Sequence, residues 1–367
     1  MEQSCLFFEL VQVALGTRNT LSRAPSDAEW NQLYGLCINQ AISGVVFPAL
    51  NVLNETGIKP PISLLYEWIG QSEQIKQHNK IINQNTAKVY ESLEKEGFDC
   101  CILKGQGNNL LYPDSFTRSP GDIDVWLMEQ DNRTSTNVKN IIGFVRGKGL
   151  DAHAMYHHVD FGQVNGTEVE IHYRPSFMFN LANNKRLQRL LLKNAEEQFR
   201  NKVELPEGVG AISVPTAEFN MVFQLAHVYN HLLHEGIGLR QIIDYFYVLK
   251  SNTNCPDNTN IYDTLQYLGL EKIAEAMMWV LHEKLGLPEE YLIAPMDERR
   301  GKVLLSEILR GGNFGHYDTE NTNASSRLKK NILRAKRDLR MMNYFPSECL
   351  WEPVFRVYHF FWRMMYN

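Results

Sequence analysis

The sequence has no C-x-x-C motif, no long apolar run and no basic excess. Its six cysteines form no C-x-x-C pair, which excludes a zinc ribbon or a disulfide-framed fold and favours a reducing compartment. No uninterrupted apolar run approaches the ~18 residues needed to cross a bilayer, so we expect no membrane partner. The N-terminus, MEQSC, has no basic start typical of a signal peptide. The sequence therefore predicts a cytoplasmic protein.

The charge balance is slightly acidic. Lysine and arginine total 37 against 42 aspartates and glutamates, a net charge of −5. This balance excludes binding to nucleic acid through a positive field over the whole molecule. With 367 residues, 44% of them hydrophobic, the chain is long enough to bury a full core and to form two or three folded units.

Three regions follow from the hydrophobic periodicity. Residues 1–97 and 181–367 show helical spacing, whereas residues 98–180 alternate as strands do. Between the last two strands, Asn165 and Gly166 form a dipeptide that is typical of a two-residue hairpin turn. We therefore predict an α+β fold, with a small mixed β-sheet embedded in a largely helical chain. The expected strands are 100–103, 123–127, 155–163 and 167–173, with a helix at 133–148.

The C-terminal region is expected to be helical throughout. The predicted helices are 184–200, 215–234, 237–250, 259–285, 323–345 and a last one from residue 350. Polar and glycine-rich stretches at 252–258 and 311–326 predict loops between them.

The strand at 123–127 carries two carboxylates. Asp122 and Asp124 project on the same side, because successive side chains of a strand alternate between its faces. Two carboxylates this close repel each other unless a cation lies between them. A divalent ion that prefers oxygen ligands, most often Mg²⁺, is the natural partner.

A third carboxylate is expected from the hairpin. In TEVEIHY, Glu168, Glu170 and His172 share one face of the strand. Simple pairing across the turn places Glu170 opposite Phe161, and Asp160 on the other face. Glu170 is therefore the first choice as third ligand, with Glu168 second.

A glycine-containing turn follows the first strand. Lys104, Gly105 and Gln106 leave that strand and enter a short helix. Backbone N–H groups at such a turn, with a lysine beside them, favour phosphate binding. Alone this signal is weak, but the D-x-D pair fifteen residues later makes it specific.

These motifs together resemble the polymerase-β nucleotidyltransferase superfamily, and within it a bacterial family of uncharacterised nucleotidyltransferases. The resemblance rests on LKG, LYPDSFTRSPGDIDVWL, VEIHYRP and LRQIIDYFYVL and covers about residues 98–250. It implies that residues 98–180 form a nucleotidyltransferase core. It also implies metal-dependent transfer of a nucleotidyl group from a nucleoside triphosphate such as ATP to an acceptor hydroxyl.

The resemblance assigns roles to particular residues. Asp122 and Asp124 would hold two Mg²⁺ ions, with Mn²⁺ as an alternative, and Glu170 would help to activate the attacking hydroxyl. Nucleotide contacts would come from Lys104, Gly105, Gln106 and Arg118. The superfamily's turn usually reads Gly-Ser, so Gln106 leaves a second hypothesis open, that of a catalytically degenerate nucleotide- or partner-binding relative. The acceptor stays open among small molecules, RNA and protein.

Some polar residues have more than one interpretation. Arg118 either clamps a phosphate or pairs with Asp114 or Asp122. His172, His227 and His231 are candidates for a substrate cleft. His227, His231 and His234 also lie at i, i+4 and i+7 of one helix, a spacing that would suit a zinc hydrolase site. The favoured interpretation is that this helix face borders the cleft.

Overall fold

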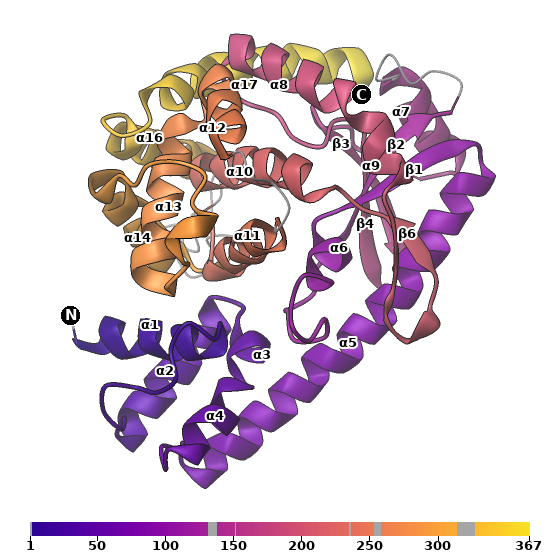
Figure 1. Cartoon of the computed structure of the whole chain (residues 1–367). Coiled ribbons are helices and arrows are strands. Elements are labelled where there is room, and N and C mark those ends of the chain that lie inside the picture. The colour runs from indigo at the N-terminus through magenta and orange to yellow at the C-terminus, as the bar shows by residue number, and fades with distance from the viewer. Residues whose placement is uncertain (1, 131–137, 151, 235, 253–257, 314–326) are drawn as a thin grey trace.

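The computed structural model describes residues 2–130, 138–150, 152–234, 236–252, 258–313 and 327–367. A helical N-terminal region, a small sheet and a larger set of C-terminal helices follow one another along the chain (Figure 1). This architecture confirms the predicted fold class.

The N-terminal region is helical, as expected. Its helices are α1 (Glu2–Ala14), α2 (Asp27–Asn39), α3 (Ser43–Val46), α4 (Ala49–Glu55) and α5 (Ile62–Lys95). A capping box starts α2, because Ser26 accepts the Glu29 N–H while the Glu29 carboxylate accepts the Ser26 N–H at 2.8 Å. The long helix α5 runs from the first helices to the sheet (Figure 1).

The sheet has four strands in the order β1-β2-β4-β3. They are β1 (Phe98–Leu103), β2 (Ile123–Glu129), β3 (His158–Val164) and β4 (Thr167–His172). Strands β1 and β2 pair antiparallel, β2 and β4 parallel, and β3 and β4 antiparallel. The short helix α6 (Gly105–Asn109) follows β1, and α7 (Val138–Gly147) follows β2. The start of the predicted helix 133–148 lies outside the described residues.

The predicted hairpin turn is confirmed. Asn165 and Gly166 have φ of 49° and 81°, the left-handed values that this turn needs. Val164 pairs with Thr167, as predicted. The predicted pairing holds as far as Gly162, which pairs with Val169, and is lost beyond it, because a bulge lies between Asp160 and Gly162. Gly162, with φ of 83°, supplies the backbone conformation that such a bulge requires.

The C-terminal region is helical apart from one small second sheet. Its elements are α8 (Leu181–Lys193), α9 (Ala195–Arg200), β5 (Lys202–Glu204), β6 (Ala211–Ser213), α10 (Ala217–His234), α11 (Leu239–Ser251), α12 (Asn258–Leu268), α13 (Glu271–Leu285), α14 (Glu298–Gly311), α16 (Arg327–Met341) and α17 (Pro346–Tyr366). Single turns of 3₁₀ helix occupy Pro206–Gly208 and Glu289–Tyr291.

Several of these elements differ from expectation. The helix expected at 259–285 is two helices, because Gly269 has φ of 76° and its hydrogen lies against the Asn183 amide, where a Cβ would clash. The helix expected at 184–200 is likewise interrupted at Asn194, and α14 and the β5–β6 pair were not predicted. Most of the expected loops lie outside the described residues.

The two helical regions contact each other directly. Gln12 donates to the Lys284 carbonyl at 3.0 Å, and Thr17 to the Leu285 carbonyl at 2.8 Å. The buried Gln40 side chain donates to the Ile308 carbonyl at 3.1 Å. The division into 1–97, 98–180 and 181–367 stays a prediction, and its first and last parts pack together.

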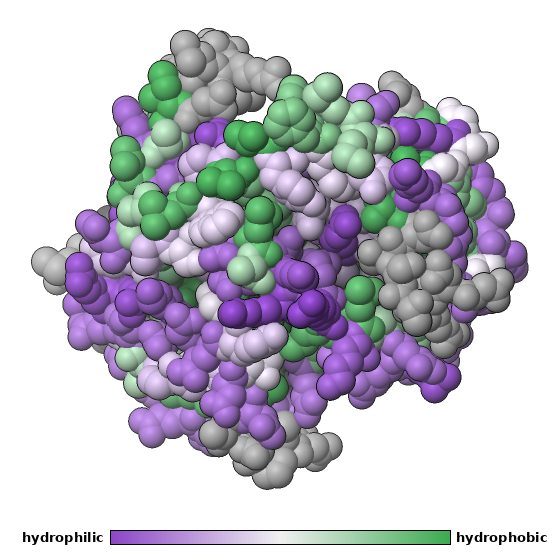
Figure 2. All heavy atoms as spheres, turned by 90° about the horizontal axis from the view of Figure 1, so that it is seen from above, coloured by the Kyte–Doolittle hydropathy of each residue, from purple (hydrophilic) through white to green (hydrophobic). Residues whose placement is uncertain are grey.

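Helix α17 crosses one side of the molecule and carries an exposed apolar face. Figure 2 looks onto that side and shows hydrophobic side chains gathered there among polar ones. The exposed residues of α17 include Leu350, Val354, Val357, Phe360, Phe361, Met364 and Met365. Within the described residues, no helix combines the length and the apolar character needed to cross a membrane.

Candidate active site

The acidic residues meet at one end of the sheet. Asp122 directly precedes β2, and Asp124 lies within it. Strands β2 and β4 pair in parallel, and in their register Asp124 lies opposite Glu170. The sheet therefore brings the carboxylates of Asp124 and Glu170 to the same level, with Asp122 one step beyond the strand. This is the arrangement that the sequence predicted for these three residues.

Asp124 is the most enclosed of the three carboxylates, with 3% of its side chain exposed. Its Oδ2 accepts from Lys104 Nζ at 3.0 Å, and its Oδ1 lies 2.8 Å from His172 Nε2. Burial alone would raise the pKa of Asp124, but the charge of Lys104 and the hydrogen bond from His172 hold that pKa well below its usual value. Asp124 is therefore ionised at neutral pH.

Asp122 and Glu170 respond differently to the same neighbourhood. The negative charge of Asp124, followed by burial, raises the pKa of Asp122. Burial also acts to raise the pKa of Glu170, but the hydrogen bond from His172 and the nearby His158 lower it overall. The repulsion between Asp124 and Asp122 is one that a cation bound between the two carboxylates would relieve.

The hairpin prediction for Asp160 was wrong. Because the bulge adds one residue to β3, Asp160 pairs with Glu170, and His158 pairs with His172. His158 Nδ1 lies 3.3 Å from Glu170 Oε2, and its Nε2 lies 3.6 Å from Asp160 Oδ1. Glu168 pairs with Gln163 at the exposed end of the hairpin. The structure thus favours Glu170 over Glu168 as the third carboxylate.

The turn after β1 brings the Lys104 side chain to the acidic residues and turns the Gln106 side chain away from them. Lys104 has φ of 51° and Gly105 has φ of 37°, so the chain turns sharply and Lys104 Nζ lies between Asp124 and His227 Nε2, 3.2 Å from the latter. The buried Gln106 side chain donates to Asn83 on α5 and accepts from Asn109 at 3.1 Å. Gln106 can therefore offer a nucleotide only its backbone N–H.

Arg118 is held by a residue that the sequence analysis did not pair with it. Its Nε and Nη2 donate to the two carboxylate oxygens of Asp244, at 2.7 and 2.8 Å. Tyr112 donates its hydroxyl to the same carboxylate at 2.6 Å. The expected pairing with Asp114 or Asp122 was wrong, because α11 brings Asp244 across. A nucleotide contact from Arg118 stays a prediction, restricted to Nη1, which lies 3.4 Å from the Ser119 carbonyl.

A pocket opens between the acidic residues and this ion pair. It has a volume of about 500 Å³, including its opening to solvent. Its walls come from the turn at Lys104, from the start of β2, and from α10 and α11. The lining side chains include Lys104, Asn108, Arg118, Asp122, Asp124, Gln224, His227, Arg240, Gln241 and Asp244. The mixture of carboxylate, amide and cationic groups suits a polar, charged substrate rather than an apolar one.

The histidines on α10 do not form a zinc site with one another. His227 faces Lys104, its ring centroid lies 4.3 Å from that of His231, and His234 contacts Arg334 Nη2 at 2.9 Å. Among the described residues, no group of metal-ligating atoms includes any of these three. The described residues therefore give the zinc hydrolase hypothesis no support. His227 lines the pocket, as expected for a cleft residue.

The sequence analysis missed several residues that line or border the site. Arg240 lines the pocket, with Nη1 donating to the Ser119 carbonyl at 3.1 Å. Asn108 and Gln224 line it as a buried pair of amides joined at 2.7 Å. His158, at the start of β3, and His157, directly before it, border the acidic residues. Adjacent histidines beside a strand that pairs with EIH were a usable signal for the last two.

A small mixed sheet that brings a D-x-D pair, a third carboxylate and a lysine turn together defines a nucleotidyltransferase-like protein. The chain belongs to the family described as uncharacterised nucleotidyltransferase, whose model matches residues 26–286. This match confirms the resemblance seen in the sequence and extends it beyond 98–250 to the helices from α2 onward.

The other comparisons are distant. A search of curated proteins found no match. One similar solved structure is the crystal structure of an antigenic nucleotidyltransferase-like protein from Paracoccidioides brasiliensis, with 13% identity and a TM-score of 0.34. The similarity covers 62% of this chain and 95% of that chain. A likeness this distant assigns no function.

Proposed function

We propose that the protein is a metal-dependent nucleotidyltransferase that uses a nucleoside triphosphate and an acceptor hydroxyl. The observation that carries this proposal is that Asp124 and Glu170 are register partners on two parallel strands, with Asp122 directly before the first strand, and that Asp122 and Asp124 line a polar pocket. Membership of the family supports the class of reaction.

The residues present fit Mg²⁺ or Mn²⁺. Three carboxylates lie near Lys104 and His172, and the charge of Asp124 raises the pKa of Asp122, a repulsion that a bound cation would relieve. Oxygen donors of this kind are the ligands that these ions prefer. Asp122, Asp124 and Glu170 would hold the ions. When bound, a pair of such ions stabilises the charge on the attacking and leaving oxygens of a phosphoryl displacement.

The chain's own groups would then orient the reactants. Lys104, whose ammonium group now contacts Asp124, is placed to neutralise phosphate oxygens at the turn. His172 holds the Asp124 carboxylate in position through a 2.8 Å hydrogen bond. As the acceptor oxygen attacks the α-phosphorus, its proton passes to a carboxylate oxygen of Glu170, and the bond from that phosphorus to pyrophosphate breaks.

The test is transfer of label from α-³²P nucleoside triphosphates in Mg²⁺ or Mn²⁺, with γ-³²P ATP in parallel. Nucleotidyl transfer places the α-label, and not the γ-label, on protein, RNA or a small acceptor. Asp124→Asn should abolish the signal, and the exposed Asp263→Asn should leave it unchanged. Transfer of the γ-label would instead indicate a kinase and contradict the proposal.

A catalytically degenerate binding relative is the second candidate. It is favoured by Gln106, whose buried amide is engaged with Asn83 and Asn109 where the superfamily usually has a serine. This candidate predicts that nucleotide binds in Mg²⁺ without transfer to any acceptor. Gln106→Ser discriminates between the two, because it restores the hydroxyl: a gain of transfer in the variant would assign the parent chain to the binding class.

A further inference from the structure

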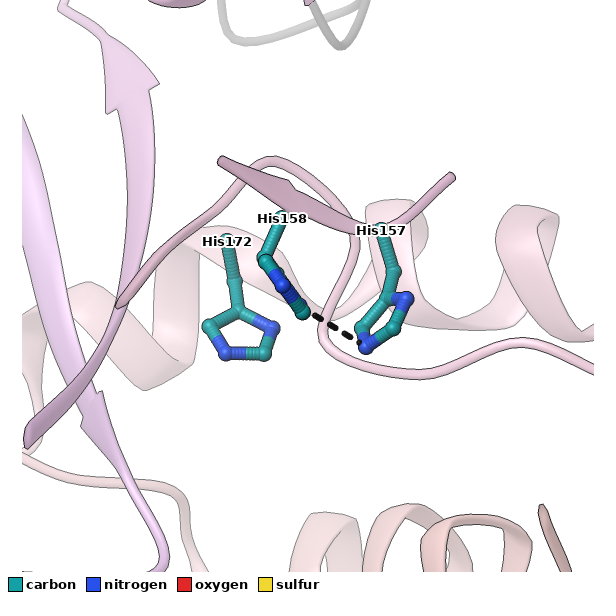
Figure 3. Close-up of side chains that lie close together, drawn as sticks. All are labelled: His157, His158 and His172. Atoms are coloured by element: carbon teal, nitrogen blue, oxygen red, sulfur yellow. Dashed lines mark hydrogen bonds between the residues drawn. The ribbon is translucent and has the colours of Figure 1, made fainter. Parts of the chain in front are cut away.

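Three imidazoles lie together beside the acidic residues. His157, His158 and His172 have ring centroids 4.4, 5.3 and 5.5 Å apart. Their ligand atoms come within 4.8 Å of one another. Figure 3 shows the three rings gathered on one side of the β3–β4 pair, with His158 drawn between the other two. Nucleotidyl transfer as proposed above gives His157 and His158 no task.

The backbone holds these residues in place. His158 is the register partner of His172 across the two antiparallel strands. The carbonyl of His157 accepts the N–H groups of Tyr173 and Arg174, both at 3.1 Å. Phe177 packs against the His157 ring, with centroids 4.9 Å apart. The cluster therefore sits on rigid elements, which is what a preformed ligand set requires.

Two of the rings have a carboxylate on the nitrogen away from the cluster. His172 Nε2 lies 2.8 Å from Asp124, and His158 Nε2 lies 3.6 Å from Asp160. Glu170 Oε2 borders the cluster, 3.3 Å from His158 Nδ1 and 3.3 Å from His172 Nε2. A carboxylate on one imidazole nitrogen fixes the tautomer and leaves the other nitrogen as a metal ligand.

The remaining nitrogens turn inward. His158 Nδ1 and His157 Nε2 lie 3.0 Å apart. His172 is 99% buried, and within the described part of the chain its Nδ1 has no hydrogen-bond partner. Figure 3 shows that nitrogen on the side of the ring nearer His158. A buried polar atom without a partner is costly, and a zinc ion that displaces the Nδ1 proton to solvent would satisfy it.

We propose that His157, His158 and His172 bind one zinc ion, separate from the Mg²⁺ held by the carboxylates. Neutral imidazole nitrogens suit zinc and are poor ligands for Mg²⁺. The ligand atoms are Nε2 of His157 and Nδ1 of His158 and His172, and a water completes a tetrahedron. Zn–N bonds of about 2.0–2.1 Å bring such atoms to roughly 3.3 Å from one another, a contraction that small ring rotations supply.

The zinc ion positions a residue of the neighbouring site. With the metal on Nδ1, His172 carries its proton on Nε2 and donates it to Asp124. His172 thereby links the zinc to the carboxylate that the nucleotidyl-transfer proposal uses. The zinc itself touches no reacting atom, so its role is to position Asp124.

The first test uses the unmodified full-length protein. Purified protein is dialysed against ZnCl₂ in a large excess of MgCl₂, and bound zinc is measured by mass spectrometry. One zinc per chain is expected. Zinc K-edge absorption should then show nitrogen neighbours at about 2.0–2.1 Å with imidazole outer shells. Absence of stoichiometric zinc, or a purely oxygen shell, would overturn the proposal without any variant.

Matched variants locate the ion. His157→Gln and His158→Gln should each weaken zinc binding by more than the 10–100-fold typical of losing an outer-shell partner. His153→Gln, an exposed histidine on the same segment, is the control and should bind like the parent. Asp122→Asn should also retain zinc. Zinc that persists in His157→Gln/His158→Gln, or that is lost in Asp122→Asn, would place the ion among the carboxylates and contradict the proposal. These readouts do not depend on nucleotidyl transfer.

Discussion

Two walls of one pocket each contain a buried aspartate in contact with a cation, yet they differ in charge balance. On the α11 side, Asp244 accepts both donors of Arg118 and the hydroxyl of Tyr112. On the sheet side, Asp124 has Lys104 and His172 as partners but also lies near Asp122 and Glu170.

This difference helps to distinguish a structural ion pair from a candidate binding site. On the α11 wall, Asp244 holds Arg118 in a two-point ion pair with good geometry, and Arg240 is a second buried cation beside them. On the sheet wall three carboxylates lie together, and the charge of Asp124 raises the pKa of Asp122. A cluster of carboxylates that repel one another is the better candidate for binding a cationic ligand.

The largest effect should come from Asp124→Asn. This change removes a carboxylate proposed to hold the metal and paired with Lys104 and His172, so label transfer should fall below detection, a loss of at least about 10²–10⁴-fold. The protein should also melt at a lower temperature, since two buried cations lose their partner. The measurement is Mg²⁺-dependent label transfer paired with thermal melting. Unchanged turnover would place the active site elsewhere.

Removing the ion pair between Arg118 and Asp244 should affect the stability of the protein more than its activity. Asp244→Asn leaves Arg118 buried without its charge partner, and we expect a loss of about 3–5 kcal/mol in the free energy of unfolding. Urea denaturation measures it. The double variant Arg118→Met/Asp244→Asn should cost no more than the more damaging single change, because the two residues act as one pair. Additive losses would show that they do not.

Asp122→Asn separates charge repulsion from charge pairing. Asp124 raises the pKa of Asp122, so neutralising Asp122 removes a repulsion, and without metal the protein should become slightly more stable, by about 1 kcal/mol or less. Metal-dependent turnover should nevertheless be lost. Melting curves with and without Mg²⁺ test both statements. A lower melting temperature in metal-free buffer would mean that Asp122 is held by a partner and not repelled.

Glu348 is a third kind of buried carboxylate, one whose hydrogen bonds come from backbone N–H groups, and its effect should appear only as the pH changes. It accepts from Phe179 and Asn180, and burial raises its pKa to about 7. A raised carboxyl pKa means that its contribution to stability is complete below the unfolded value near 4.5 and is lost as the pH rises through about 7.

The Glu348→Gln variant should not show this loss of stability with rising pH. Relative to the parent, the variant should gain stability between about pH 5 and pH 8, by about 1.4 kcal/mol for each unit of pKa difference. Denaturation at a series of pH values compares the two chains. Parallel stability curves would show that Glu348 does not titrate in this range.

Local signals explain what the sequence could predict of the site. The alternation in DIDV and TEVEIH placed Asp122, Asp124, Glu170 and His172 on strand faces, and the family motif placed those strands together. The same local reasoning failed at Asp160, because one bulge shifts a strand by one residue and reverses the faces beyond it. Gly162 inside a strand was the available warning.

Long-range partners were out of reach of sequence reasoning. Arg118 was matched with nearby acids in the sequence, yet its partner Asp244 lies 126 residues away. Gln106 was expected to face a phosphate, but α5 supplies Asn83 and turns the amide away from the pocket. The sequence predicted a single helix in place of α12 and α13 because their apolar spacing continues across Gly269.

The sequence by itself determined the class of fold, the hairpin turn and the identity of the acidic residues, because helical and strand periodicities, turn propensities and the D-x-D motif are properties of neighbouring residues. Only the tertiary structure decided which charges are paired and which carboxylates lie close enough to repel one another. It also decided that His157, His158 and His172 form one cluster. Those outcomes depend on distances between segments far apart in the chain. Whether a buried charge is stable depends on the partners that other elements bring to it.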